Sequence, residues 1–170
     1  KKKLNNNLMM FFTGFTRFSS DVQKINFIDS PSDRTDMLKK MYNLVDEAED
    51  ILTNTEKDLD DFGRLLDITW KLKRQTGGAV STNSIDHLYT RGIEAGALGG
   101  KLLGAGGGGF LVFYVQPEKQ LAVMNAMSDL MYIPFEFENG GTRIIHYSPE
   151  SYEPIADNMR LSYVNKNEPK

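Results

Sequence analysis

The stretch Gly99-Gly100-Lys101-Leu102-Leu103-Gly104-Ala105-Gly106-Gly107-Gly108-Gly109-Phe110, here called the glycine run, contains seven glycines in twelve residues. It continues into Leu111-Val112-Phe113-Tyr114-Val115, an apolar block that predicts a buried strand. Glycine weakens a strand and frees the backbone, so such a cluster requires a reason. Backbone without side chains can approach a ligand closely, and its N–H groups can line an anion site. The alternative is a flexible linker, but linkers usually lie between polar segments and this run lies between apolar ones.

Two familiar glycine motifs do not fit the glycine run. Gly104-x-Gly106-x-x-Gly109 matches the dinucleotide-binding pattern formally, but that pattern follows a strand and opens a helix. Here the glycines open a strand. A Walker phosphate loop requires Ser or Thr directly after its lysine, and Leu102 follows Lys101. The run therefore needs another interpretation.

Composition limits the classes of protein to which the chain can belong. The 170 residues are 40% hydrophobic and 25% charged, as in one soluble globular domain. A net charge of −3 argues against a broad nucleic-acid surface. There are no cysteines, which excludes disulfides and thiolate chemistry and agrees with a reducing, cytoplasmic compartment. No apolar run approaches the roughly 18 residues of a membrane span, so no membrane partner is expected.

Before the glycine run, the pattern predicts one strand followed by helices. The apolar block 8–12 predicts a strand, and Ser19-Ser20-Asp21 predicts the cap of a short helix that ends near Ile28. Apolar residues then recur at helical spacing in three segments, 37–52, 59–70 and 85–93. Asn83 and Asp86 are expected to cap the last of these helices.

After the run, we expect a helix and then a hairpin. Pro117 is placed to start the helix, whose apolar face would comprise Leu121, Met124, Met127 and Met131. Residues 133–138 alternate like a strand, Asn139-Gly140-Gly141 is a hairpin signal, and 143–147 would return. The order indicates an α+β fold with a mainly antiparallel sheet covered by helices on one face. We expect one domain over residues 1–150 and a C-terminal tail over residues 151–170.

The residues alone assign no catalytic group and no metal site. His87 and His146 are the only histidines, and their spacing matches no metal-binding motif. The carboxylates at 46–50 and 58–61 fall on helical faces, where solvated charge is expected. No nucleophile elbow supports a hydrolase.

Three patches resemble a known superfamily, the kinases of galactose, homoserine, mevalonate and phosphomevalonate (GHMP kinases). Residues 101–110 resemble its third motif, K-x-x-G-A-G-G-G-G-[FC], through their whole length. Phe11-Phe12-Thr13-Gly14-Phe15-Thr16-Arg17 resembles the T-G-x-x-R segment of the sugar-phosphate branch. Residues 70–74 and 81–86 resemble the helix and loop before the glycine motif. Together the patches extend from about residue 8 to residue 147.

The resemblance implies a ferredoxin-like C-terminal kinase domain with added helices. It implies transfer of the γ-phosphoryl group of ATP, with Mg²⁺ bridging phosphates, to the anomeric hydroxyl of heptose 7-phosphate. The expected nucleotide-side residues are Gly104, Ala105, Gly106, Gly107, Gly108 and Gly109. Thr13 and Arg17 would face the sugar phosphate, where a guanidinium suits phosphate binding, and Lys73 and Lys101 are further substrate-binding candidates.

The superfamily also carries an earlier loop, P-x-x-x-G-L-G-S-S-A, that holds the nucleotide phosphates and does not occur among these 170 residues. The chain begins at Lys1-Lys2-Lys3 without a methionine. We interpret it as the C-terminal half of a kinase, inactive alone, whose partner is the N-terminal half. A non-catalytic ligand-binding or interaction module of ferredoxin-like fold is one alternative. Another GHMP kinase, of the fucose or mevalonate type, is the other.

Overall fold

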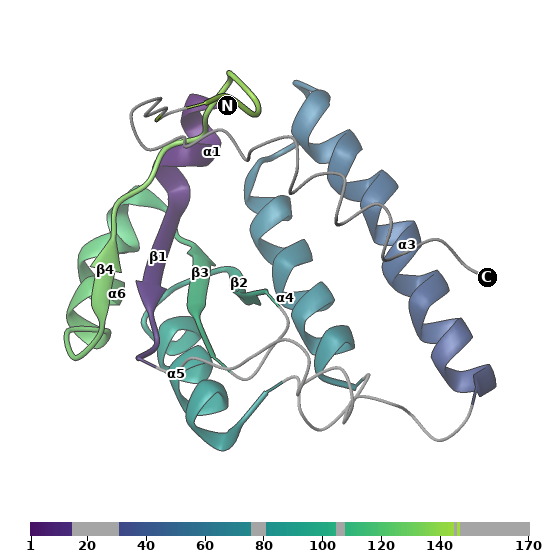
Figure 1. Ribbon diagram of the computed structural model, residues 1–170, viewed down its shortest axis with the longest axis horizontal. Helices are drawn as coiled ribbons and strands as arrows, with labels where there is room; N and C mark the ends of the chain where they lie inside the picture. Colours follow the sequence, from purple (N-terminus) through teal and green to yellow (C-terminus); the bar gives the residue numbers. More distant parts are fainter. Residues whose placement is uncertain (15–30, 76–80, 105–107, 145, 147–170) are drawn as a thin grey trace, which may run out of the picture. The chain divides into compact units, whose positions relative to one another are not determined.

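The computed structural model describes residues 1–14, 31–75, 81–104, 108–144 and 146 (Figure 1). The helix expected after Ser19, Arg17 and the tail 151–170 lie outside these residues. The chain divides into two compact units, Lys1–Phe137 and Glu138–Lys170, which are described separately. The domain boundary expected at residue 150 also falls outside the described residues.

The first unit is built on a four-stranded sheet in the order β2-β3-β1-β4. Its strands are β1 (Leu8–Phe12), β2 (Gly99–Leu103), β3 (Phe110–Tyr114) and β4 (Met131–Ile133), and every neighbouring pair is antiparallel. Helices connect β1 to β2 and β3 to β4 (Figure 1). This is the β-α-β-β-α-β order of a ferredoxin-like domain, so the predicted α+β class is confirmed.

The helices agree closely with the periodicities of the sequence. Between β1 and β2 lie α3 (Pro31–Thr53), α4 (Asp60–Gln75) and α5 (Asn83–Glu94). A 3-10 turn, Pro117–Lys119, leads into the short α6 (Gln120–Ala126). The cap of α5 differs from the expectation: Thr82 is the N-cap, and its hydroxyl accepts the Ile85 N–H at 3.3 Å.

One face of the sheet forms the core beneath α5 and α6. Met9 and Phe11 of β1 are 3% and 0% exposed, whereas the alternate residues of the strand are half-buried. They pack in one cluster with Ile85 of α5 and Val123 of α6. Each such buried side chain contributes about 1.5–3 kcal/mol to stability.

The other face, here called the open face, is apolar but less covered. Strand register places its residues in rows across the sheet. The row beside the glycine run is Leu103, Phe110, Phe12 and Met131, and the next is Lys101, Val112, Met10 and Ile133. Leu103 and Phe110 are each 37% exposed and Met131 is 65% exposed. The open face therefore presents apolar side chains next to the glycine run.

The structure adds two elements that the sequence pattern did not predict. One is the six-residue helix α1 (Lys2–Asn7), and the other is β2, whose first residues are Gly99 and Gly100. A Cβ at Gly99 would lie 2.0 Å from the Gly63 carbonyl oxygen of α4, and one at Gly100 would lie 2.5 Å from the Val112 carbonyl oxygen. These two glycines permit close packing within the domain.

Two expectations for the C-terminal part of the first unit are wrong. Of the residues expected on the apolar face of this helix, Met124 and Met127 pack against the core, but Leu121 is 73% exposed and Val123 is the buried residue of α6. Met131 begins β4 instead of belonging to that helix. The strand expected over 133–138 is also not formed, because the described residues after Ile133 contain no strand, and the expected return strand 143–147 lies partly outside the described residues. Pro134 cannot donate a ladder hydrogen bond, and β4 ends just before it.

The described part of the second unit contains a tight turn. The Glu138 carboxylate accepts the N–H groups of Asn139 and Gly140 at 2.7 and 2.8 Å, and Arg143 pairs with it at 3.1 Å. These N–H groups lower the pKa of Glu138. Among the described residues, no helix has the length and apolarity that crossing a membrane requires.

Candidate functional site

Three strands bring the sequence-predicted residues together at one end of the sheet. Phe12, Phe110 and Leu103 are register partners, so the residues that follow β1, precede β3 and follow β2 are adjacent. These residues are Thr13, Gly109 and Gly104. We call this part of the domain the loop end. Ala105, Gly106 and Gly107 lie outside the described residues.

Thr13 is buried and holds the end of the glycine run. It is 4% exposed, its hydroxyl donates to the Gly109 carbonyl at 3.0 Å, and the Gly109 N–H donates to the hydroxyl at 3.2 Å. The Thr13 backbone N–H donates to the same carbonyl at 2.9 Å. Thr13 thus has a structural role that sequence reasoning did not assign, and its contact with substrate stays a prediction.

The backbone conformation at positions 104 and 109 favours glycine. Their φ angles are +90° and +107°, in a region that other residues rarely adopt. A Cβ at Gly104 would meet nothing within 4 Å, so space does not exclude a side chain there. Their backbone angles are what set the direction in which the run leaves β2 and enters β3.

Lys73 reaches the loop end, and the charge of Lys101 in β2 acts on it. The Lys73 ammonium, near the C-terminus of α4, donates to the Gly104 carbonyl at 3.0 Å and is partly buried. Burial lowers the pKa of Lys73, and the positive charge of Lys101 lowers it further. Lys101 lies on the open face, in the row with Val112. Lys73 and Lys101, two of the predicted substrate-binding residues, therefore repel each other electrostatically.

Arg74, the neighbour of Lys73, joins α4 to α5. Its guanidinium pairs with the Asp86 carboxylate at 2.8 Å, and the Ser81 hydroxyl donates to the same carboxylate at 2.6 Å. Asp86 was expected to cap the helix. It instead fixes the C-terminus of α4 beside the N-terminus of α5.

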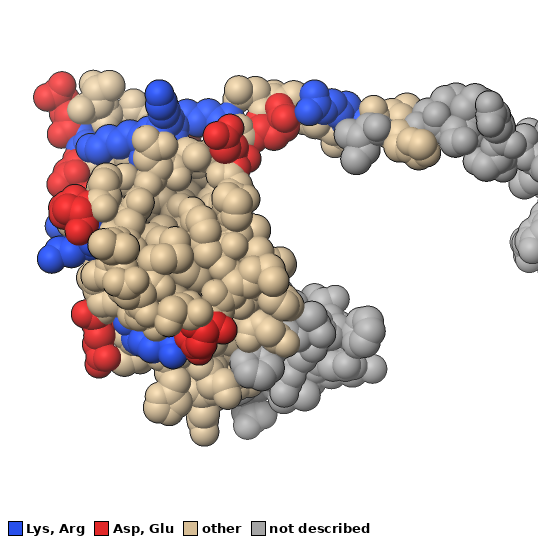
Figure 2. All heavy atoms as spheres, turned by 90° about the vertical axis from the view of Figure 1, so that its left-hand side faces the viewer, with Lys and Arg blue, Asp and Glu red and all other residues tan. Residues whose placement is uncertain are grey.

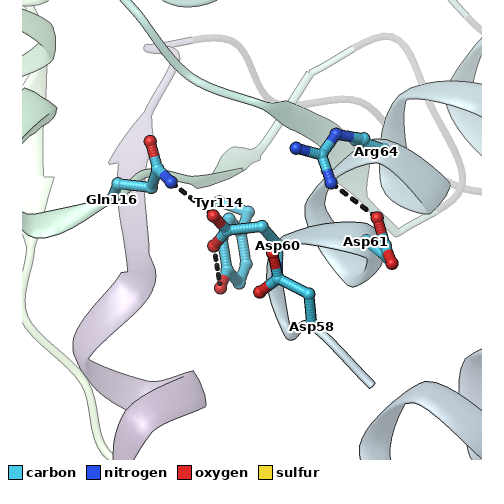
Figure 3. A network of polar contacts seen from close by, with 6 residues as sticks. All are labelled: Asp58, Asp60, Asp61, Arg64, Tyr114 and Gln116. Atoms are coloured by element: carbon cyan, nitrogen blue, oxygen red, sulfur yellow. Dashed lines mark hydrogen bonds and ion pairs between the residues drawn. The ribbon is translucent and has the colours of Figure 1, made fainter. Parts of the chain in front are cut away.

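A second polar cluster lies at the opposite end of β3 (Figure 3). The Tyr114 hydroxyl donates to the Asp60 carboxylate at 2.9 Å and accepts from the Asn7 amide at 2.7 Å, and Gln116 also donates to Asp60. Burial is the main cause that raises the pKa of Tyr114. Asp60 was predicted to be solvated. Its partners are remote in the sequence, so periodicity carried no signal for this cluster.

A hollow of about 500 Å³ opens beside this second cluster. It is lined by Lys2, Lys3, Asn6, Asn7, Asp60, Gln116, Pro117 and Glu118. The carboxylate of Asp60 is already bonded within the domain, and the lysines belong to α1. The loop end is the better candidate site, because the Lys73 ammonium and the glycine backbone meet there.

The donors at the loop end fit phosphate oxygens better than a metal ion. Two ammonium groups and the backbone of a glycine run are groups that bind anions. Within the described ranges, no group of three His, Asp or Glu residues could hold a metal ion. We therefore assign no magnesium ligand to the described residues.

Comparison with known proteins identifies the domain. The profile of the family described as GHMP kinases C terminal matches residues 40–133, more than half of the chain. The chain belongs to the GHMP kinase family. The match covers Lys73, Lys101, the glycine run and all strands except β1, and it agrees with the ferredoxin-like fold.

Two curated relatives illustrate the range of similarity. The D-glycero-alpha-D-manno-heptose 7-phosphate kinase of Campylobacter jejuni is 29% identical over 122 residues, which are 70% of this chain and 35% of that protein. A mevalonate kinase of Thermococcus sibiricus is 34% identical over 123 residues, which are 67% of this chain and 36% of that protein. The chain thus spans about a third of the length of the curated relatives that it matches.

Solved structures share the fold at lower identity. The mevalonate kinase of Methanococcus jannaschii has a TM-score of 0.64 at 23% identity, covering 78% of this chain and 40% of that chain. A putative sugar kinase from Campylobacter jejuni has a TM-score of 0.53 at 24% identity, covering 81% of this chain and 38% of that chain. At these identities, the likeness concerns the fold alone.

Proposed function

We propose that this chain is the C-terminal domain of an ATP-dependent sugar-phosphate kinase that phosphorylates heptose 7-phosphate at its anomeric hydroxyl. The observation that carries the proposal is the loop end, where Lys73, Lys101 and the glycine run meet in a GHMP kinase domain. Phosphoryl transfer depends on positioning and on charge neutralisation, and these groups supply both. ATP and Mg²⁺ would bind mainly to a domain that carries the P-x-x-x-G-L-G-S-S-A loop.

The support for a phosphorylated sugar as acceptor comes from one relative and one segment. The heptose 7-phosphate kinase of Campylobacter jejuni matches 70% of this chain. The T-G-x-x-R segment places Arg17 four residues after Thr13, which lies at the loop end. A guanidinium in that position would bind the 7-phosphate through paired hydrogen bonds.

The open face supports the proposal of a second domain. Leu103, Phe110 and Met131 are exposed beside the glycine run, and the matched relatives are about three times as long as the aligned part of this chain. Figure 2 shows the adjoining side of the domain over β4 and α6, where an uncharged area lies between charged margins. Apolar surface of this kind is usually covered by another domain or chain. We assign the domain with the nucleotide loop as the occupant.

A mevalonate-type kinase is the second candidate function. Six mevalonate kinases match the chain, one of them at 37% identity over 94 residues. Their acceptor, as the name states, is mevalonate, which carries a carboxylate instead of a phosphate. The cationic loop end can accept either anion, so the acceptor has to be measured.

Steady-state kinetics of the full-length protein test the proposal. Kinase activity is measured with ATP and, in turn, heptose 7-phosphate, fucose and mevalonate. We expect the highest kcat/KM with heptose 7-phosphate. A higher kcat/KM with mevalonate would establish the second candidate, and no transfer to any of the three would contradict both.

Replacement of Arg17 by alanine separates the two candidates further. Loss of a paired, charge-assisted contact should raise KM for heptose 7-phosphate by about 10- to 150-fold and leave KM for ATP nearly unchanged. Arg17→Lys should restore only part, because lysine keeps the charge but lacks the planar fork. An effect confined to ATP would place Arg17 on the nucleotide side and remove the argument for a phosphorylated acceptor.

A further inference from the structure

The helix α3 carries two adjacent apolar stripes, and one of them is covered. The covered stripe repeats at four- and three-residue intervals and is half-buried or buried: Met37, Met41, Leu44, Ala48 and Ile51. The helix α3 packs against α4, which in turn packs against β2 (Figure 1). The covered stripe is therefore the side that α3 turns toward the rest of the domain.

The second stripe, here called the α3 stripe, is exposed. Its members repeat at the same intervals, one position further along the helix: Leu38, Tyr42, Val45 and Leu52, with Glu49 at the remaining position. These four apolar side chains are 51%, 70%, 59% and 45% exposed. Intervals of four and three residues are typical of the seam between two packed helices. Single apolar residues are ordinary on a surface, but a row of them marks an interaction site.

The charges of α3 are unevenly distributed along its length. Among the described side chains, residues 35–44 contain Asp36, Lys39 and Lys40, whereas residues 45–53 contain Asp46, Glu47, Glu49 and Asp50. Lys39 and Asp46 flank the α3 stripe, and neither forms an ion pair with another described residue. A parallel partner of the same sequence would place the two acidic halves side by side. An antiparallel one would place the lysines of each helix beside the acidic half of the other.

One antiparallel register suits both the apolar residues and the charges. When Tyr42 packs on Val45 of a second copy, two-fold symmetry also places Val45 on Tyr42 of that copy. In the same register Lys39 faces Asp46 across the seam, and this contact again occurs twice. Glu49 lies opposite Leu38 toward each end of the seam and limits the strength of the pairing. The helix is thus complementary to itself, a property that contact with an unlike segment would not require.

We propose that the α3 stripe is the interface of a homodimer, in which a second copy of this chain packs antiparallel along it. The domain with the nucleotide loop is assigned to a different surface, the open face. The dimer goes beyond the proposed function and does not depend on which acceptor is phosphorylated. Because Glu49 lies in a short seam, we expect a dissociation constant of about 1–100 μM.

Sedimentation velocity of the full-length protein tests the interface. The wild type should change from monomer to dimer as its concentration rises through this range. Val45→Glu should raise the dissociation constant by at least about 100-fold, because it places two like charges at the centre of the seam and removes apolar contacts. Asn43→Glu is the matched control, since it adds the same charge at an exposed position of the same helix, about 200° around the axis from Val45. This control should associate like the wild type.

Exchange of two charges tests the antiparallel register. Lys39→Glu and Asp46→Lys should each raise the dissociation constant about 3- to 30-fold, because each leaves two pairs of like charge across the seam. The double variant restores opposite charges in both pairs and should associate nearly as well as the wild type. A parallel partner or an unlike partner would gain nothing from the exchange.

Four results would overturn the proposal. They are a wild type that is monomeric at every concentration, a dimer that Val45→Glu leaves unchanged, an equal loss in Asn43→Glu, and no recovery in the double variant. A monomeric wild type whose urea midpoint falls in Val45→Glu but not in Asn43→Glu would identify the occupant as part of the same chain, either residues 147–170 or the domain with the nucleotide loop. Absence of phosphoryl transfer from an intact dimer would contradict the proposed function only.

Discussion

Replacing Gly99 with alanine tests how closely α4 packs on β2. The new Cβ would lie 2.0 Å from the Gly63 carbonyl oxygen and 2.7 Å from the Asp67 nitrogen. Both are backbone atoms of α4, so the helix would have to move away by about 1 Å, because real Cβ contacts essentially never fall below 3.0 Å. Overpacking a core typically lowers the free energy of unfolding by 1–3 kcal/mol, and rigid backbone places this variant near the upper end, about 3 kcal/mol.

Gly104→Ala is the contrast, because that glycine has space but a positive φ. Its expected loss is about 1–2 kcal/mol of backbone strain. Asparagine tolerates the left-handed region, so Gly104→Asn should be more stable than Gly104→Ala. At Gly99 the order should reverse, because asparagine is larger. Urea denaturation followed by circular dichroism measures all four variants. The same order at both positions would refute the distinction between a packing glycine and a conformational glycine.

Three further predictions concern polar contacts. Tyr114→Phe should lower the free energy of unfolding at pH 7 by about 1–3 kcal/mol, because Asp60 and Asn7 lose their hydrogen-bond partner. The control is Tyr42→Phe, at a side chain that is 70% exposed, which should change this free energy by less than about 0.5 kcal/mol. Urea denaturation of both variants measures the difference. Thr13→Val should lower thermal stability and increase hydrogen exchange at the Gly109 amide, because the hydroxyl that bonds Gly109 is lost. Thr13→Ser keeps the hydroxyl and should preserve most of the protection of this amide. Equal exchange in both variants would contradict the role of the hydroxyl. The pKa of Lys73 is lower in the folded protein than in the unfolded chain, where it is 10.5, so the stability of the wild type relative to Lys73→Met should rise as the pH increases toward 10.5. A flat difference in urea midpoints would show no shift of this pKa, and a falling difference would show the opposite shift.

Local periodicity predicted most of the helices and the two central strands. The stripes in 37–52, 59–70 and 85–93 correspond to α3, α4 and α5, and the apolar blocks correspond to β1 and β3. Most of these elements bury one face or both, so their patterns repeat at the period of the element, although Ile51 is the only buried residue among the described side chains of α3. The ferredoxin-like order was implied by the resemblance to the GHMP kinases and is confirmed by the strand order.

The wrong predictions have different physical causes, and close packing between segments remote in the sequence is one of them. Gly99 and Gly100 were not predicted to form a strand, but a Cβ at Gly99 would meet α4 and a Cβ at Gly100 would meet β3, so packing makes glycine suitable for a strand there. Leu121 was predicted to belong to the apolar face of the helix, but it lies on the side of α6 opposite the buried Val123. The alternation in 133–138 predicted a strand, and the described residues after Ile133 form none.

The candidate site could be predicted in part. The glycine run, Thr13, Lys73 and Lys101 were named from the sequence, and the structure brings Thr13, Gly104, Gly109 and Lys73 to one end of the sheet. The contact of Lys73 with Gly104 spans 31 positions and leaves no local signal. The bonds of Thr13 to Gly109 span 96 positions, so the structural role of that hydroxyl was equally hidden.

Paramagnetic NMR of the full-length protein with Mn²⁺-ADP tests the central claim most directly, namely that substrate phosphates bind at the loop end. Mn²⁺ replaces Mg²⁺ and broadens amide resonances near the nucleotide phosphates, and a titration with Mn²⁺ alone corrects for binding to surface carboxylates. The account predicts that ADP-dependent broadening affects Lys101, Gly104 and Gly109 and leaves Tyr114 and Gln116, at the other end of β3, unchanged. ADP-dependent broadening at Tyr114 and Gln116 with none at Gly104 and Gly109 would contradict it.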